Sequence, residues 1–182
     1  MTITRPGPAE YSPYHIPYLR FVPEGTDPLV LLQRQPDDVR ALLGSLTDQQ
    51  ALTRYAPGKW SIKEALVHLI DTERIFAYRA LRIARGDQTP LPGFEQDDYV
   101  PNSGADARLL TDIWAEYEAV RTATLLLLNS LTESALARVG VVNGNVLSVR
   151  ALIHVLAGHE AHHIQLFKEK YLACINTKKA TD

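Results

Sequence analysis

The chain of 182 residues has the length of one ordinary domain, and its 46% hydrophobic and 22% charged residues are typical of a globular protein with a buried core. Nineteen basic and 21 acidic residues give a formal charge of −2, which argues against nucleic acid or an anionic membrane as a partner. The one cysteine, Cys174, excludes an internal disulfide framework, and no apolar run approaches the roughly 18 residues of a membrane span. Because the N-terminus lacks the apolar stretch of a secretion signal, we expect a cytoplasmic protein.

The first 25 residues form a region of their own. Proline at high density disfavours helix and favours extended backbone, and tyrosine rings can lie flat on an apolar surface. We therefore expect an extended N-terminal arm over residues 1–25 that covers the core or a partner subunit, with a frayed tail as the alternative. Its prolines and tyrosines are Pro6, Pro8, Pro13, Pro17, Pro23, Tyr11, Tyr14 and Tyr18.

Helix start signals follow the arm. A Thr-Asp-Pro sequence at 26–28 offers a capping side chain and then proline at the first helical position, so a helix is expected as far as residue 43, before Gly44. A Thr-x-x-Gln capping box at 47–50 predicts a short helix to about residue 54. A second capping box, Ser-x-x-Glu at 61–64, predicts a long helix that ends near residue 85.

The second half of the chain is also expected to be mainly helical. Residues 89–102 are expected to form an acidic, aromatic loop, and a third long helix is expected over about 105–131, with one further turn at 132–137. Residues 139–145 are interpreted as a linker with a tight turn at Asn143-Gly144.

Ser148 is the expected cap of a fourth long helix that continues to about Cys174. Four main helices with no alternating strand pattern predict an all-α fold, a four-helix bundle. We expect the bundle to span residues 26–175, between the arm and a C-terminal tail at 176–182.

Histidines provide the strongest functional signal. His159 and His163 are four residues apart, so they lie on one face of the fourth helix, together with apolar residues that turn toward the core. His68 lies two turns into the second long helix, and these two helices can face each other in a bundle. Burying imidazoles without partners is costly, whereas neutral imidazole is a good metal ligand. Three such ligands leave a coordination position open, as in catalytic rather than structural zinc sites.

The order and spacing of several motifs resemble the DinB-like, YfiT-like metal-dependent family of four-helix bundles, over roughly residues 27–173. The motifs are Lys59-Trp-Ser61, His68-Leu-Ile-Asp-Thr-Glu73, Leu91-Pro-Gly-Phe-Glu-Gln-Asp97 and His159-Glu-Ala-His-His-Ile-Gln165. The resemblance implies metal ligation by His68, His159 and His163. The family includes thiol-dependent transferases and isomerases as well as proteins described as metal-dependent hydrolases, so it implies a site more firmly than a substrate.

A zinc-protease interpretation fits less well. Residues 159–163 match the H-E-x-x-H pattern, in which the glutamate, here Glu160, is the general base. The extended pattern requires glycine at 166 and histidine at 169, where this chain has leucine and glutamate, and no glutamate follows Glu169. We therefore regard a metalloprotease as unsupported.

Three carboxylates are candidate catalytic residues: Glu64, Asp71 and Glu160. Glu64 and Asp71 lie about one turn on either side of His68, where a carboxylate can hold a histidine N–H or a water on the metal. The capping box already accounts for Glu64, and a carboxylate that pairs helices would account for Glu160. His154 is expected in the core or an interface, His162 beside the ligands or on the surface, and His15 is expected to be incidental.

Two functional hypotheses follow. In the first, a divalent metal, with zinc or nickel favoured and iron or manganese as further candidates, activates water for hydrolysis or a low-molecular-weight thiol for transfer to a small-molecule substrate. In the second, the metal only staples two helices of a non-enzymatic structural or stress protein. We expect no nucleic-acid or membrane partner, and self-association into a homodimer.

Overall fold

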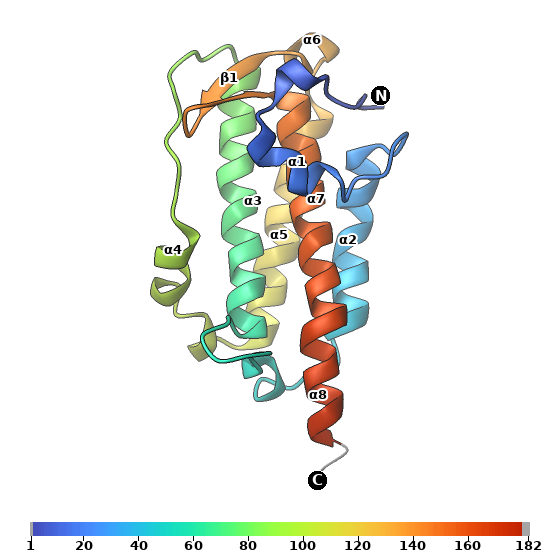
Figure 1. Ribbon diagram of the computed structural model, residues 1–182, viewed down its shortest axis with the longest axis vertical. Helices are drawn as coiled ribbons and strands as arrows, with labels where there is room; N and C mark the ends of the chain where they lie inside the picture. Colours follow the sequence, from blue (N-terminus) through green and yellow to red (C-terminus); the bar gives the residue numbers. More distant parts are fainter. Residues whose placement is uncertain (1, 180–182) are drawn as a thin grey trace.

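The computed structural model describes residues 2–179, with side chains for residues 2–175. Its main elements are four long helices that run along one axis (Figure 1). They are α2 (Pro28–Leu43), α3 (Ile62–Ala84), α5 (Leu110–Asn129) and α7 (Val149–Leu166). α3 packs against α5 and α7, and α2 packs against the same two helices, so the four form a closed ring. The expected four-helix bundle is confirmed.

Local capping fixes the starts of these helices. The side chains of Asp27, Ser61 and Ser148 accept hydrogen bonds from the first-turn backbone of α2, α3 and α7, and Ser61 and Glu64 complete a reciprocal capping box. Thr47 and Gln50 also make the predicted reciprocal bonds, although they precede only the short η3 (Gln50–Leu52).

The helical segment that starts with α7 continues beyond the predicted end of the fourth helix near Cys174. A π-helical turn, η5 (Phe167–Tyr171), leads into α8 (Leu172–Lys179). Residues 176–179 of the expected tail are therefore helical, and residues 180–182 lie outside the described part of the chain.

The expectations for residues 89–110 need correction. The expected loop contains the seven-residue helix α4 (Gln96–Asn102). The third long helix does not start near 105, because η4 (Ala105–Ala107) is followed by extended backbone at Arg108. α5 begins at Leu110, whose N–H donates to Asp48 Oδ1 at 2.8 Å. This cap comes from a residue 62 positions away, which no local pattern reveals.

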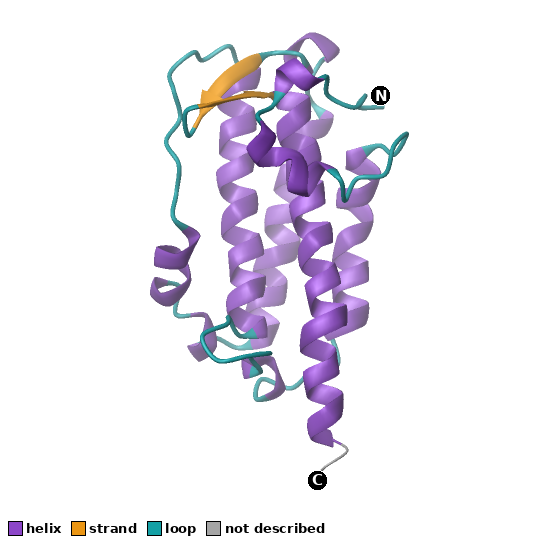
Figure 2. Ribbon diagram, in the orientation of Figure 1, coloured by secondary structure: helices purple, strands orange, loops and turns teal. Residues whose placement is uncertain are grey.

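The expected linker at 139–145 is a β-hairpin (Figure 2). β1 (Val139–Val142) pairs antiparallel with β2 (Asn145–Ser148), and Leu91 bridges to Val142 on the outer edge. The predicted tight turn is confirmed, because Asn143 and Gly144 both have positive φ, as a type I′ turn requires. α6 (Glu133–Leu136) forms the extra turn expected at 132–137.

The N-terminal arm is ordered on the bundle. It contains the short turns η1 (Pro8–Glu10), η2 (Pro13–His15) and α1 (Ile16–Leu19), separated by extended residues, and α1 packs on α7. Ile3, Leu19 and Val22 are buried. The arm therefore covers the core, and the alternative of a frayed tail is wrong for residues 2–25.

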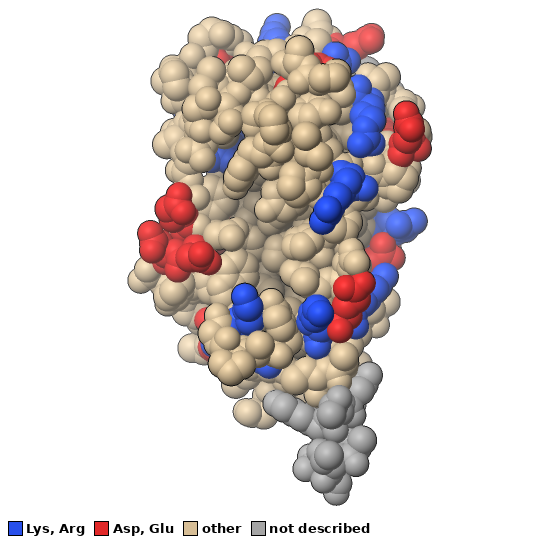
Figure 3. Space-filling model, in the orientation of Figure 1, with Lys and Arg blue, Asp and Glu red and all other residues tan. Residues whose placement is uncertain are grey.

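The core is divided into two hydrophobic halves, one at each end of the bundle. Between them each long helix contributes buried polar side chains: Gln35, His68, Thr72, Glu73, Arg121, Thr124, His159, Glu160 and His163. Among the described residues, no helix is long and apolar enough to cross a membrane. Figure 3 shows one face of the molecule, where acidic residues gather over α4 and a neutral hollow separates them from α7.

Candidate metal centre

His68 is the residue that α3 contributes to the histidine cluster, among the buried polar side chains between the two halves of the core. The capping box at Ser61 and Glu64 sets the start of the helix, and His68 follows one turn after Glu64. Its ring is almost fully buried, with 4% of the residue exposed, and packs on the Trp60 ring with centroids 4.7 Å apart. The helix start and Trp60 together hold His68 in one orientation.

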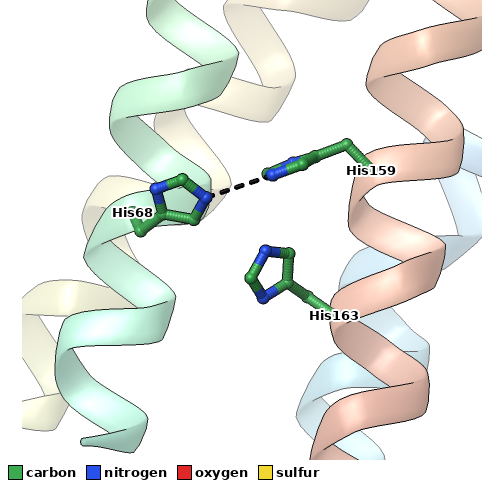
Figure 4. A group of neighbouring side chains, drawn as sticks. All are labelled: His68, His159 and His163. Atoms are coloured by element: carbon green, nitrogen blue, oxygen red, sulfur yellow. Dashed lines mark hydrogen bonds between the residues drawn. The ribbon is translucent and has the colours of Figure 1, made fainter. Parts of the chain in front are cut away.

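His159 and His163 enter from α7, one turn apart on the face toward α3. All three rings point toward one another across the gap between the two helices (Figure 4). His68 Nε2 lies 3.1 Å from His159 Nε2, and one ligand atom from each of the three residues lies within 4.8 Å of the others. The structure therefore brings together the three residues that the sequence analysis singled out.

This donor set fits a metal ion. Two nitrogens bound to one tetrahedral zinc at about 2.1 Å are about 3.4 Å apart, close to the spacing of His68 and His159. Among the described side chains, the only hydrogen bond made by these three rings is the one between His68 and His159. The remaining ring nitrogens are thus available to a ligand.

Burial also keeps these rings neutral. It lowers the pKa of His68 to about 4 and the pKa values of His159 and His163 well below the ordinary value, and the neighbouring histidines add to the last two effects. Neutral imidazole is the form that binds metal, so no proton has to be displaced at neutral pH.

Two cavities border the cluster. A narrow cavity of about 80 Å³ reaches His68 and His159 from the side of the hairpin, and an open cleft of about 780 Å³ reaches His159 and His163 from the side of α4 and η5. Tyr18, Gln96 and His159 line both. The histidine cluster is therefore accessible from two directions.

The three candidate carboxylates occupy different environments. Glu64 lines the open cleft, but it accepts from Ser61 N–H and pairs with Arg54. Asp71 lines neither cavity and lies near Arg74. Glu160 turns away from the cluster to Tyr117 and Arg121. The catalytic assignment of these residues stays a prediction, and Glu64 alone among them faces a cavity that reaches the histidines.

Glu160 belongs to a buried ionic network. Arg121 of α5 donates to Glu73 of α3 at 2.9 Å, to Glu160 of α7 and to the Leu32 carbonyl of α2. Tyr117 donates to the other oxygen of Glu160. Burial raises the pKa of Glu160, while the Arg121 charge opposes that shift. This network ties all four helices together directly behind the cluster.

The other histidines divide as follows. His154 is buried in the core, with its Nδ1 2.8 Å from the Arg150 carbonyl oxygen, as expected. His162 lies at the rim of the cleft against Tyr18 and Phe21. His15 was expected to be incidental, but it is buried and lines the narrow cavity.

Sequence reasoning missed Tyr18, Gln96 and Arg79 as cavity residues. Tyr18 was noted only as one of the arm's aromatic residues, and its ring lies 5.3 Å from that of His159 between centroids. Gln96 had no signal of its own, because its approach to the cluster depends on how the 89–95 loop folds back on α3. Arg79 lies on the same face of α3 as His68, about three turns further on, but nothing in the sequence set it apart from the other arginines of that helix.

The fold and the cluster define a four-helix bundle with a candidate three-histidine metal site. The model of the DinB superfamily matches residues 31–167, which include all three histidines, and the chain belongs to this superfamily.

Two curated relatives, each named "putative metal-dependent hydrolase", come from Oceanobacillus iheyensis and Geobacillus thermodenitrificans. The first is 29% identical over 69% of this chain and 73% of its own length, and the second is 28% identical over 74% and 77%. A solved structure of YfiT from Bacillus subtilis, titled a "probable metal-dependent hydrolase with an unusual four-helix bundle topology", matches with a TM-score of 0.71 at 16% identity. It covers 91% of this chain and 90% of the other, so the two proteins share a fold.

Proposed function

We propose that this protein is a metal-dependent enzyme whose divalent ion is bound by His68, His159 and His163. The observation that carries the proposal is the convergence of three buried, neutral imidazoles from two helices, within 4.8 Å of one another. Zinc or nickel suits such a set of nitrogen ligands best, with iron and manganese as further candidates. Bound there, the metal would supply a Lewis acid that activates water or a thiol at neutral pH.

The residues of the chain contribute positioning and shielding. Trp60 packs on His68 and Tyr18 packs on His159, so these two ligand rings each have an aromatic neighbour that limits their rotation. Tyr18 lines both cavities, and burial raises the pKa of its hydroxyl, which therefore stays protonated at neutral pH. Gln96 adds an amide at the same junction.

Hydrolysis of a small-molecule substrate is the first candidate reaction, and the names of the two curated relatives support it. Transfer of a low-molecular-weight thiol is the second. The two cavities that meet at His159 support this alternative, because they allow two molecules to approach the centre from different sides. In both cases the open cleft has room for the larger reactant.

Metal analysis tests the proposal. Protein purified without a metal-binding tag is expected to retain or take up close to one divalent ion per chain, and the variant with alanine at positions 68, 159 and 163 is expected to take up none. Metal-dependent turnover of an ester panel, or adduct formation with a thiol and an electrophile, then identifies the reaction. A folded wild-type protein that binds no divalent metal would overturn the proposal.

A non-enzymatic metal staple is the competing function. The placement of the ligands on α3 and α7 favours it to the extent that a bound ion would join two helices. This alternative predicts metal-dependent stability without turnover of any ester or thiol.

Self-association into a homodimer also stays a prediction, which size-exclusion chromatography with light scattering tests.

A further inference from the structure

One stripe of α3 leads from the candidate metal centre to a buried arginine. His68, Thr72, Phe76 and Arg79 all line the narrow cavity. They lie at helical positions i, i+4, i+8 and i+11, and eleven residues complete just over three turns, about 3.06 at 3.6 residues per turn. The stripe therefore forms one wall of the cavity, with His68 at one end and Arg79 at the other.

Arg79 is a buried cation that has no carboxylate as an ion-pair partner among the described residues. Only 7% of the residue is exposed, and among the described residues no acidic side chain forms an ion pair with it. Its Nη2 donates to the Pro92 carbonyl at 2.8 Å, and its guanidinium lies 5.5 Å and 5.6 Å from the ring centroids of Phe76 and Phe94. Burial lowers its pKa. A buried charge with no counter-ion is costly, so this site favours an anion.

Thr72, which also lines the cavity, is a second buried polar residue on this stripe. Its Oγ1 is buried and has no hydrogen-bond partner. The cavity of about 80 Å³ holds roughly two or three water molecules, or a group of similar size. An anionic group bound in the cavity would supply the counter-ion that Arg79 lacks.

We propose that the narrow cavity binds the carboxylate of a small monoanionic substrate through Arg79, and presents the rest of that substrate to the histidine cluster. The reaction at the histidine end of the cavity rests on the proposed function. The binding of the anion by Arg79 does not.

Charge balance favours a carboxylate over a phosphate. Arg79 is the one arginine or lysine among the described residues that line the cavity. His15 is kept neutral, because burial and the Arg79 charge both lower its pKa. A carboxylate carries a single charge that Arg79 can neutralise with its planar fork of donors, whereas a phosphate ester near pH 7 carries closer to two. The second charge would be buried without a partner.

The test measures binding of propionate and of propionamide, its neutral counterpart, to metal-free protein. Working without metal prevents the carboxylate from binding to the ion instead. Propionate is expected to bind at millimolar concentration by titration NMR, and propionamide at least about tenfold more weakly. The propionate methyl group is expected to show cross-relaxation with the rings of Phe76 and Phe94.

Variants of two neighbouring arginines on α3 provide the control. Arg79→Gln is expected to weaken propionate binding about tenfold or more, and Arg79→Lys by a smaller factor, because lysine keeps the charge but loses the fork. Arg82→Gln removes a cation that pairs with Asp87 outside the cavity, and it is expected to leave propionate binding unchanged.

Three results would overturn the proposal: equal affinity for propionate and propionamide, equal propionate affinity in wild type and Arg79→Lys, or absence of contact with the two rings. The second and third results are obtained without the Arg79→Gln variant, so the proposal can still be tested if that variant fails to fold. A separate zinc titration reports on the proposed metal centre. Loss of zinc binding with propionate binding intact would contradict the proposed function alone.

Discussion

Gly158 governs how the N-terminal arm approaches the histidine cluster. It precedes His159 on α7, and a methyl group at this position would overlap the backbone carbonyl of Tyr18. The clash is with main-chain atoms, so a side-chain rotation cannot relieve it. The absence of a side chain at 158 is therefore what allows Tyr18 to lie against His159.

The substitution Gly158→Ala is expected to lower the free energy of unfolding by about 1–3 kcal/mol, since overpacking displaces the arm. Helix propensity alone predicts the opposite sign, a gain of up to about 1 kcal/mol. Urea denaturation separates the two. A more stable variant would show that the arm does not press on α7 at this point.

The buried histidines make the stability of the metal-free protein depend on pH. The pKa of His68 is about 4 in the folded protein, against about 6.5 when unfolded. Between these values only the unfolded chain takes up the proton, so stability is fully present above pH 6.5 and falls as the pH drops toward 4.

We expect His68 to account for a loss of roughly 2 kcal/mol between pH 7 and pH 5. His68→Gln titrates in neither state, so its stability should fall less over the same interval by about that amount. Denaturation in the presence of a chelator at both pH values measures the difference. Parallel pH profiles for the two proteins would contradict burial of a neutral ring at position 68.

The residue scale also shows what the sequence could predict of the site. His68, His159 and His163 stood out because imidazoles at helical spacing on apolar faces need a partner, and that need is local. Arg79 shares a helix face with His68 and is enclosed there by the 89–95 loop, whereas Tyr18 and His15 reach the cavities only through the folding of the arm. Their positions depend on contacts between distant segments, which no spacing rule encodes.

At the scale of elements, the Arg121 network joins the helices of the bundle. Arg121 bonds to groups of α2, α3 and α7, and it neutralises charge on Glu73 and Glu160. Both carboxylates and the arginine are buried. Removing the arginine would leave two carboxylates in the core without a counter-ion.

Arg121→Met is therefore expected to destabilise the protein by about 3–5 kcal/mol in urea denaturation. Arg40 provides a matched control, because it forms an ion pair between α2 and α5 with Glu118, and both side chains are half exposed. Arg40→Met should cost less than about 1 kcal/mol. Similar losses in the two variants would mean that the buried network does not hold the helices together.

The prediction of secondary-structure elements was right where a local interaction determines where the element begins. Asp27, Ser61 and Ser148 cap their own helices, so the starts of α2, α3 and α7 were predictable. β1 and β2 were missed because four residues are too few to show alternation, and the bridge from β1 to Leu91 is a tertiary contact. α4 was missed because Pro101 and a run of acidic residues are typical of a loop.

At the scale of the whole molecule, the histidine cluster lies where the two hydrophobic halves of the core meet. Two neighbouring helices, α3 and α7, run through both halves, and each supplies ligands at that level. A bound ion would thus connect the helices near the middle of their length, where buried polar groups replace apolar packing. Its effect should extend to the global stability of the fold.

Zinc at a free concentration of 100 times its Kd is expected to stabilise the folded protein by about 2.7 kcal/mol, because the unfolded chain does not hold the ligands together. For a domain of this size that corresponds to a rise in Tm of roughly 5–10 °C. Hydrogen exchange should slow in both α3 and α7, since the ligands come from both helices. His68→Gln should abolish the rise in Tm and the protection of α3. Protection confined to α7 in the wild-type protein would mean that the ion binds His159 and His163 without joining the two helices.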